Sequence, residues 1–383
     1  MKKILFYASD GIGLGHLQRV RHIAQAIKTR NRNIKIILVT TSPKFLVFGR
    51  FFHYCIRLIP LSDSLSGPGY QKACLINGTR MLSALGRFQP NIVVADFFLS
   101  SNFHFYPLGY ALDRRPTKNI FIWRLGDRRD FSRSLRKEAH KLRYFSRILL
   151  PHSQEELKYL LPSKFLKKIR SYPKFQICAP IFGKLDRGKL FFCRKKYKIF
   201  PEDFLITISF GGGGAANISK CDSPEKILRN FLLIYPRLMQ IIPNLKVIIT
   251  TGPYCRKMPE SGFKIPPTLK IVEFEKNLFE LIHLSKLVIS PASYNICYEI
   301  LEAKTPAILV PLLRADREQF ERAQYFKKKG IAKIWKGDSS GRLLDLIIGC
   351  QKSLKKMEAN FRKISKIRPG NQMAAKAILK FVR

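Results

Sequence analysis

Short runs of consecutive apolar residues, rich in β-branched and aromatic side chains, recur along the chain and constrain its fold most strongly. Segments with helical spacing separate these runs. Strands buried on both faces have this composition, because helices cover a parallel sheet on both sides. The runs are KILFYAS, IKIILVTT, NIVVADFF, NIFIWRL, RILLPHS, FLITISF, LKVIITTG, LKIVEF, KLVISPAS and PAILVPLL. The sequence therefore predicts an α/β protein with parallel sheets.

Length and a break in this pattern predict two domains. A chain of 383 residues exceeds what one hydrophobic core usually fills. Between 176 and 203 the sequence is basic and shows no helical period, and the pattern then restarts with FLITISF and four glycines. We expect two Rossmann-like domains facing a cleft. The expected parts are an N-terminal domain over 1–180, a linker over 181–202, a C-terminal domain over 203–350, and C-terminal helices over 351–383 that pack back across the domains.

Charge is the unusual feature of the composition. Seventy Lys and Arg against 26 Asp and Glu give a net charge of +44. Such a field attracts polyanions, whether nucleic acid, an anionic membrane surface or a phosphate-bearing substrate. The basic residues are spread over the whole chain, however, and diffuse charge on all exposed faces explains them equally well. No helix-turn-helix, zinc-finger or aromatic RNA-binding motif is present, which argues against specific nucleic-acid binding.

Cysteine usage and hydropathy bear on localisation. The eight cysteines show no metal-ligand spacing and no CxxC pair, so reduced thiols in a cytoplasmic protein are expected. No apolar run approaches the roughly 18 residues of a membrane-spanning helix. Any membrane contact is therefore expected to be peripheral, on the inner face, where anionic lipids attract Lys and Arg.

The segment ILFYASDGIGLGHLQR at 4–19 combines a strand, a glycine-spaced turn and the start of a helix. Gly13 and Gly15 let the backbone turn tightly and let a ligand approach. The free N–H groups of the helix start suit an anion or a sugar hydroxyl. His16 is the residue of this segment that can exchange a proton near neutral pH, and Arg19 follows three positions later. We expect His16 to be catalytic and Arg19 to contact an acceptor phosphate.

Two further polar residues follow predicted strands. Asp96 ends NIVVADFF and Arg124 follows NIFI, at the sheet edge where ligands collect in such folds. Asp96 could orient His16, bind an acceptor or cap a helix. Arg124 could grip an acceptor phosphate. The remaining histidines follow no common pattern and are interpreted as structural.

The second half contains two candidate ligand loops. Gly211, Gly212 and Gly213 follow FLITISF, and a run of glycines exposes backbone N–H groups to a diphosphate. The run lacks the ending of a P-loop, which disfavours ATP hydrolysis of that kind. In the region 287–323, Ser293 precedes a predicted helix that carries Glu299. A carboxylate at this place can accept both hydroxyls of a ribose.

With these motifs the chain resembles the GT-B glycosyltransferases, particularly the N-acetylglucosaminyltransferases that complete the lipid-linked peptidoglycan precursor. The resemblance spans nearly the whole chain and is strongest over 287–335. It implies that Glu299 binds the ribose of UDP and that Glu318 and Gln319 face the sugar hydroxyls. It also implies a backbone contact to uracil from Phe274–Glu275, and a place for the glycine loop near the diphosphate. Ser293 stands where family members often have glycine.

The resemblance implies a metal-independent transferase without a cofactor. A UDP-sugar of the N-acetylhexosamine or hexose type would be the donor, and a phosphate-bearing or lipid-linked glycan would be the acceptor. His16 would deprotonate the acceptor hydroxyl. Departing UDP would be neutralised by glycine-loop N–H groups and a helix N-terminus, since no DxD motif is present to hold a metal ion.

Other activities remain open at this point. The GxGxGHxxR form of the N-terminal loop is also similar to a UDP-sugar hydrolase of nonulosonic acid synthesis. In that case water takes the place of the acceptor. A 2-epimerase of the same fold is a further alternative, although the sequence shows no additional acidic pair for its chemistry. A nucleic-acid-binding protein is the alternative from outside the enzymes.

Overall fold

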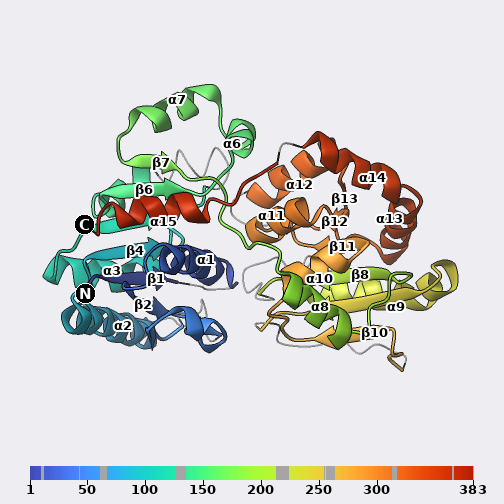
Figure 1. Ribbon diagram of the computed structural model, residues 1–383, viewed down its shortest axis with the longest axis horizontal. Coiled ribbons are helices and arrows are strands. Elements are labelled where there is room, and N and C mark those ends of the chain that lie inside the picture. The colour runs from blue at the N-terminus through green and yellow to red at the C-terminus, as the bar shows by residue number, and fades with distance from the viewer. Residues whose placement is uncertain are drawn as a thin grey trace. The chain divides into compact units, whose positions relative to one another are not determined.

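The computed structural model describes residues 1–9, 13–42, 44–60, 67–125, 135–212, 224–253, 255, 264–312, 317–364 and 366–382. The chain divides into two compact units. Unit 1 contains Met1–Phe182 and Arg368–Arg383, and unit 2 contains Gly183–Ile367. Figure 1 shows the elements of both units. None of the helices in the described ranges combines the length and apolar character needed to cross a membrane.

Unit 1 is built on a seven-stranded sheet in the order β3-β2-β1-β4-β5-β6-β7, with every pair parallel. This is the doubly wound order of Rossmann folds with one added strand. The strands are β1 (Lys3–Ala8), β2 (Lys35–Thr40), β3 (Tyr54–Arg57), β4 (Ile92–Asp96), β5 (Asn119–Ile122), β6 (Arg147–Leu150) and β7 (Phe175–Ile177). The helices are α1 (Gly15–Arg30), α2 (Gly67–Phe88), α3 (Asn102–Arg114), α5 (Ala139–Leu142), α6 (Gln154–Leu160), α7 (Ser163–Ser171) and α15 (Asn371–Leu379), with a 3-10 helix η1 (Phe45–Phe51).

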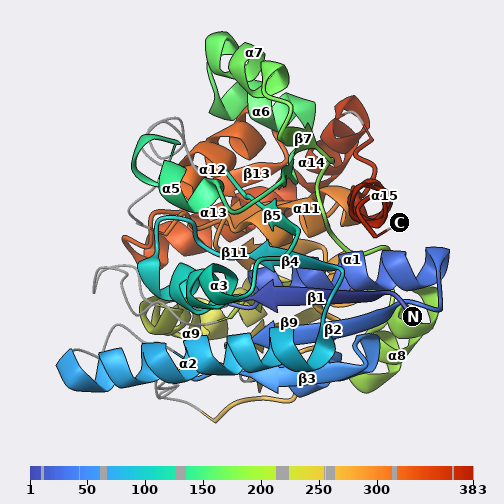
Figure 2. The same ribbon diagram turned by 90° about the vertical axis from the view of Figure 1, so that its left-hand side faces the viewer.

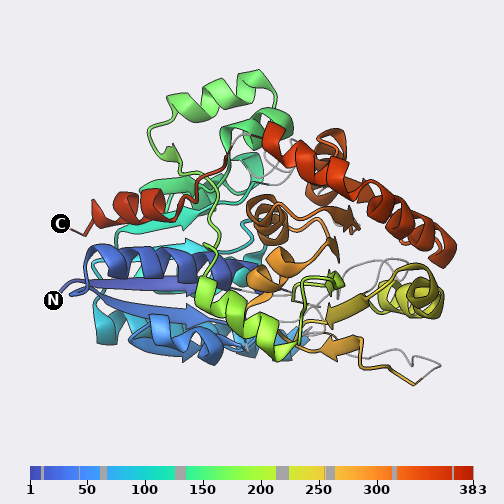
Figure 3. The same cartoon turned by 45° about the vertical axis from the view of Figure 1, so that its right-hand side comes forward.

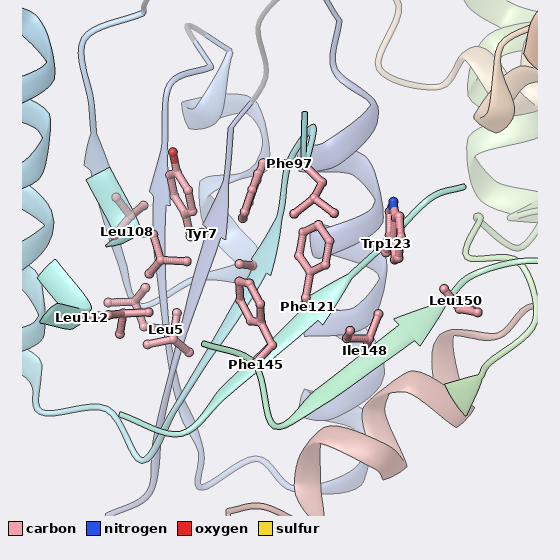
Figure 4. Close-up of a cluster of buried hydrophobic side chains, with 14 of the residues drawn as sticks. Leu5, Tyr7, Phe97, Leu108, Leu112, Phe121, Trp123, Phe145, Ile148 and Leu150 are labelled. Carbon is pink, nitrogen blue, oxygen red and sulfur yellow. The ribbon is translucent and has the colours of Figure 1, made fainter. Parts of the chain in front are cut away.

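The core of unit 1 explains why its strands lack polar alternation. All five residues of β4 are buried, so helices must cover both faces of the sheet. Leu5, Phe121 and Phe145 belong to the cluster on one face, which α2 and α3 close through residues such as Met81 and Leu108. Figure 4 shows aromatic rings of this cluster projecting from the strands of the sheet.

The last helix of the chain returns to unit 1. Helix α15 packs beside α1, as Figures 2 and 3 show in dark red and blue. Gly370, just before α15, packs against the backbone of residues 178–180. Its N–H donates to Pro180 O, and a Cβ there would lie 1.9 Å from Cys178 O. Asn371 adds hydrogen bonds with the backbone of Phe182. A side chain at position 370 would therefore push the two segments apart.

Unit 2 repeats the doubly wound order in a six-stranded parallel sheet, β10-β9-β8-β11-β12-β13. The strands are β8 (Phe204–Ser209), β9 (Leu245–Thr250), β10 (Leu269–Val272), β11 (Leu287–Ser290), β12 (Ala307–Leu309) and β13 (Ala332–Ile334). The helices are α8 (Arg187–Lys196), α9 (Pro224–Ile241), α10 (Leu278–Leu284), α11 (Tyr294–Ala303), α12 (Glu318–Lys328), α13 (Ser340–Lys352) and α14 (Leu354–Asn360), followed by the 3-10 helix η3 (Phe361–Lys363).

Successive residues of β11 divide the core of unit 2 between the two faces of the sheet. Leu287 and Ile289 lie in the cluster with residues of α9 and α13. Val288 lies in the cluster with residues of α11 and α12. The expected α/β class with two Rossmann-like parallel-sheet domains is thereby confirmed. The expected cleft between the domains stays a prediction.

The segment expected as a linker, 181–202, contains a regular helix. Asp186 caps α8 by accepting from the N–H of Lys189 at 3.1 Å. Cys193 and Tyr197, one turn apart, are buried, and α8 packs against α10 of unit 2. The helical period of buried residues was not recognised from the sequence, because Phe191 and Phe192 add apolar side chains outside the buried stripe. At the other end of the chain, α14 belongs to unit 2 and α15 to unit 1.

Candidate active site

His16 lies at the point where the strand order of unit 1 reverses. Strand β1 ends at Ala8, which is paired with Asp96 at the end of the neighbouring β4. Helix α1 starts at Gly15, so His16 lies in its first turn above these strand ends. In open parallel sheets, ligands bind outside the carboxyl ends of the strands at such a reversal. The fold therefore places His16 and Asp96 where a ligand site is expected.

His16, Asp96 and Arg19 form a buried, hydrogen-bonded group. His16 Nδ1 lies 2.5 Å from Asp96 Oδ1. Arg19 donates to both carboxylate oxygens, from Nε to Oδ2 and from Nη2 to Oδ1, each at 2.8 Å. Arg19 and Asp96 are 2% and 0% exposed. Because His16 and Arg19 are three residues apart on one helix, a single carboxylate from β4 reaches both of them.

Burial and the neighbouring charges together determine the pKa values of Asp96 and His16. Burial would raise the pKa of Asp96, but Arg19 and His16 outweigh it and hold that pKa below its usual value. Burial lowers the pKa of His16 below its ordinary 6.5, with Arg19 and Arg124 acting in the same direction and Asp96 opposing them. We assign the Nδ1 proton to the bond with the ionised Asp96. Although Arg19 Nη2 lies 2.9 Å from the same nitrogen, it donates to the stronger carboxylate acceptor.

Aromatic and basic groups surround the His16 imidazole. The Phe98 ring meets it edge-on, with centroids 4.7 Å apart, and the Arg124 guanidinium lies 5.5 Å from the centroid of the same Phe98 ring. A second imidazole, His104, contacts Phe98 and has its Nδ1 2.7 Å from Ser9 Oγ. Burial and the neighbouring His16 lower the pKa of His104 to about 4, so it is neutral at physiological pH.

Among the site residues expected in unit 1, His16, Asp96 and Arg124 lie near one another or near a shared ring, whereas Arg19 has a different partner from the one expected. Asp96 is hydrogen-bonded to His16, and Arg124 lies beside the Phe98 ring that contacts His16. Arg19 was expected at an acceptor phosphate. Instead its guanidinium is buried against Asp96, because the nearby carboxylate offers two acceptors that match the planar fork. Gly13 and Gly15 precede His16, and Gly15 is the first residue of α1; their contact with a ligand stays a prediction.

Phe98 and His104 were missed by reasoning from sequence. Both follow β4 closely in the chain, His104 in the first turn of α3 and Phe98 just before it. Their closeness in sequence to Asp96 could have identified them, since residues directly after a strand end lie at the ligand-binding edge of a parallel sheet.

The second reversal of strand order lies between β8 and β11 in unit 2. Gly211 follows β8 in the left-handed region, with φ of 62°, and its N–H donates to Ser209 Oγ. This conformation explains a glycine at position 211. Gly212 follows it, and Gly213 lies outside the described residues. Ser293 precedes α11, which carries a half-buried Glu299 in its second turn.

The first turn of α12 is tied to the loops after β11 and β12. Gln319 Oε1 accepts from the N–H of Leu312 at 3.1 Å. Gln319 is buried, and within the described part of the chain its Nε2 has no hydrogen-bond partner. Arg322, which sequence reasoning did not single out, donates to Ala292 O at 2.9 Å and pairs with Glu318. A buried amide with an unused donor is a candidate ligand contact.

The carboxylates of Glu318 and Glu275 in unit 2 pair with neighbouring groups of the protein. Glu318 was expected to face sugar hydroxyls, but its carboxylate is buried and lies 3.5 Å from Arg322. Glu275 accepts hydrogen bonds from Tyr197 Oη and from the N–H of Asn277, and it pairs with Lys196. These partners outweigh burial and lower its pKa. The expected uracil contact of Phe274–Glu275 involves backbone atoms and stays a prediction.

The described residues bear on the expectations for cysteines and metal ligands. Seven cysteines there are free thiols. Among the described residues, no group of three or more His, Cys, Asp and Glu side chains is arranged to hold a metal ion.

The sequence of unit 2 matches a known domain family. Residues 223–379 match the glycosyltransferase family 28 C-terminal domain. Two curated relatives carry the same name, UDP-N-acetylglucosamine--N-acetylmuramyl-(pentapeptide) pyrophosphoryl-undecaprenol N-acetylglucosamine transferase. The relative from Treponema denticola is 27% identical over 55% of this chain and 51% of its own length. The relative from Carboxydothermus hydrogenoformans is 30% identical over 36% and 35%. The matches thus span about half or less of these relatives.

Solved structures confirm the fold over the whole chain. MurG of Acinetobacter baumannii is similar with a TM-score of 0.58 at 14% identity, covering 99% of this chain and 100% of that one. The UDP-GlcNAc 2-epimerase of Neisseria meningitidis, bound to UDP-GlcNAc, is similar with a TM-score of 0.60 at 17% identity, covering 99% and 98%. Transferases and an epimerase thus share this fold, and the fold alone does not select the reaction.

Proposed function

We propose that this protein is a glycosyltransferase that moves a sugar from a UDP-sugar to an acceptor hydroxyl. The observation that carries the proposal is the His16–Asp96 pair at the reversal of strand order in unit 1. The match of residues 223–379 to the glycosyltransferase family 28 C-terminal domain supports it. The relatives' names include a UDP-N-acetylglucosamine donor and an undecaprenol-linked acceptor. An N-acetylhexosamine or hexose donor and a lipid-linked, phosphate-bearing acceptor are therefore proposed here as well.

In the proposed reaction, His16 acts as the general base. With Nδ1–H donated to Asp96, Nε2 carries the lone pair that takes the proton of the acceptor hydroxyl as its oxygen attacks the anomeric carbon. Asp96 stabilises the imidazolium that forms, and its own ionisation is maintained by Arg19. Arg124 is proposed to bind an acceptor phosphate beside this base.

Unit 2 is proposed to bind the donor. Glu299 would accept the ribose hydroxyls, and Gln319 would donate its unused Nε2–H to a sugar hydroxyl. Backbone N–H groups near Gly211 and Gly212 would face the diphosphate and neutralise the departing UDP. The proposal needs no metal ion, so activity is expected to survive treatment with EDTA.

The proposal is tested by incubating the full chain with UDP-, GDP- and dTDP-sugars, with and without a polyprenyl-diphosphate-linked glycan. We expect UDP release that depends on the acceptor, and a product whose mass increases by one sugar. Full-rate release of free sugar without acceptor would instead identify a UDP-sugar hydrolase. Interconversion of the free nucleotide sugars would identify an epimerase. Turnover that stops in EDTA and returns with a divalent cation would contradict the proposed metal independence.

A further inference from the structure

Helix α8 presents large aromatic side chains to solvent. Its core-facing positions are filled by Cys193 and, one turn later, by Tyr197, both buried. Phe191 and Phe192 are 70% and 48% exposed, although a helix in a globular unit usually turns such side chains inward. Figure 1 shows α8 beside α10, the element on which its buried side packs. The exposed phenylalanines are therefore additional to the apolar stripe that holds α8 in the fold.

Basic side chains lie beside these rings, and Lys276 is exposed. Phe200, just after the helix, is 54% exposed and lies 5.2 Å from the ammonium of Lys246. The ammonium of Lys276 lies 5.6 Å from the Phe192 ring. We define the α8 patch as the exposed residues Phe191, Phe192, Arg194, Lys195, Lys198 and Phe200. Adjacent exposed aromatic residues ringed by charge mark an interaction surface, whereas single exposed apolar residues do not.

Apolar and basic side chains dominate the segment that contains α8. From 184 to 200 the sequence contains seven Lys and Arg and a single acidic residue, Asp186. It contains no Ser, Thr, Asn or Gln, and its one tyrosine is buried. Stacking aromatic rings beside Lys and Arg also suit single-stranded nucleic acid, so an unstructured RNA is included in the test below. Diffuse positive charge on a chain of +44 does not explain the exposed phenylalanines.

We propose that the α8 patch docks on an anionic phospholipid surface. The phenyl rings enter the boundary between headgroups and acyl chains, and the cations contact lipid phosphates while their aliphatic stems lie along the same boundary. Each basic residue near such a surface adds to the attraction, and the rings make the binding partly independent of salt. The α8 patch contains none of the residues assigned to the reaction, so it does not depend on which sugar is transferred.

The test is flotation of the full chain with vesicles of phosphatidylcholine alone or mixed with equal phosphatidylglycerol. We expect binding to the anionic vesicles, and a drop of about tenfold or more for Phe191→Ala combined with Phe192→Ala. Leu233→Ala is the matched control, because Leu233 is 67% exposed on α9 of the same unit. This control should bind as the wild type does. Unchanged melting temperatures for all variants show that folding is intact.

A second pair of variants separates the α8 patch from overall charge. Arg194→Glu with Lys195→Glu changes the net charge as much as Lys355→Glu with Lys356→Glu on α14, where both lysines are exposed. We expect the first pair to weaken vesicle binding far more than the second. Equal losses for the two pairs, or full binding by the double alanine variant, would overturn the proposal. So would an unstructured RNA that competes fully with vesicles and is lost with the same two phenylalanines.

Discussion

Arg19 and Asp96 form a two-point ion pair that is removed from solvent in unit 1. Nε and Nη2 of the arginine each lie 2.8 Å from a different carboxylate oxygen, and Oδ1 also faces Nδ1 of His16. A carboxylate that serves both a fixed cation and a titrating imidazole stays ionised and keeps the imidazole oriented. The pair thus links the stability of unit 1 to the protonation of its proposed base.

Replacing Arg19 by Met should lower the free energy of unfolding by about 3–5 kcal/mol, because it leaves the Asp96 charge buried with less compensation. The double variant Arg19→Met with Asp96→Asn should lose much less than the sum of the two single losses. Chemical denaturation of the four proteins measures this coupling. Additive losses would show that the two side chains do not stabilise each other.

The pH dependence of the reaction should reflect the low pKa of His16. Neutral His16 is the base, so kcat/KM should fall only as the pH drops through this pKa, which burial and Arg19 place below 6.5. Arg19→Met removes a positive neighbour and should move this acidic limb to higher pH. Arg19→Lys, which keeps the charge, should move it less. An unshifted limb in Arg19→Met would exclude Arg19 as a determinant of the His16 pKa.

His16→Ala should reduce kcat by about 10²- to 10⁴-fold, the usual contribution of a positioned general base. Its affinity for UDP should stay near that of the wild type, because the donor is proposed to bind to unit 2. Steady-state kinetics and calorimetry measure the two effects. His22→Ala is the control, since His22 is also buried on α1 but is not in the hydrogen-bonded group with Asp96. Wild-type turnover in His16→Ala would remove the residue from the mechanism.

Glu299→Gln should weaken UDP binding by about 1–3 kcal/mol, the range of a lost hydrogen bond to a charged group. Glu302→Gln on the same helix provides a matched carboxylate that is not assigned to the nucleotide. Isothermal calorimetry with UDP compares the two variants. Equal affinities would place the ribose elsewhere in unit 2.

Gly370→Ala should destabilise the protein by about 1–3 kcal/mol, the cost of overpacking, because its Cβ would meet Cys178 O and Ala179 O at 1.9 and 2.3 Å. Gly349→Ala within α13 has nothing within 4 Å of the added Cβ and should raise stability by about 0.5–1 kcal/mol. Thermal unfolding followed by circular dichroism gives both changes. A neutral Gly370→Ala would mean that the segments at 178–180 and 370 separate at little cost.

Three strands had no predictive run in the sequence, and all three are edge strands. β3 and β7 close the two edges of the sheet in unit 1, and β13 lies at an edge in unit 2. Apart from Ala332 in β13, their residues are partly buried or exposed, so selection for uninterrupted apolar side chains is absent there. The interior strands, covered on both faces, were all predicted. Helix α8 was missed for the opposite reason, since it has more apolar residues than its buried stripe needs.

Local patterns in the sequence determined the α/β class, the interior strands, the helix start beside His16 and the acidic residue at the end of β4, because each depends on neighbours close in the chain. Which partner each charged group takes was decided by the tertiary structure. Arg19 and Asp96 are 77 residues apart, and only the pairing of β1 with β4 brings them together. Once buried, a carboxylate must find a cation nearby, and that requirement placed Arg19 on Asp96 rather than on a ligand. Strand order and burial, which no local pattern encodes, made that choice.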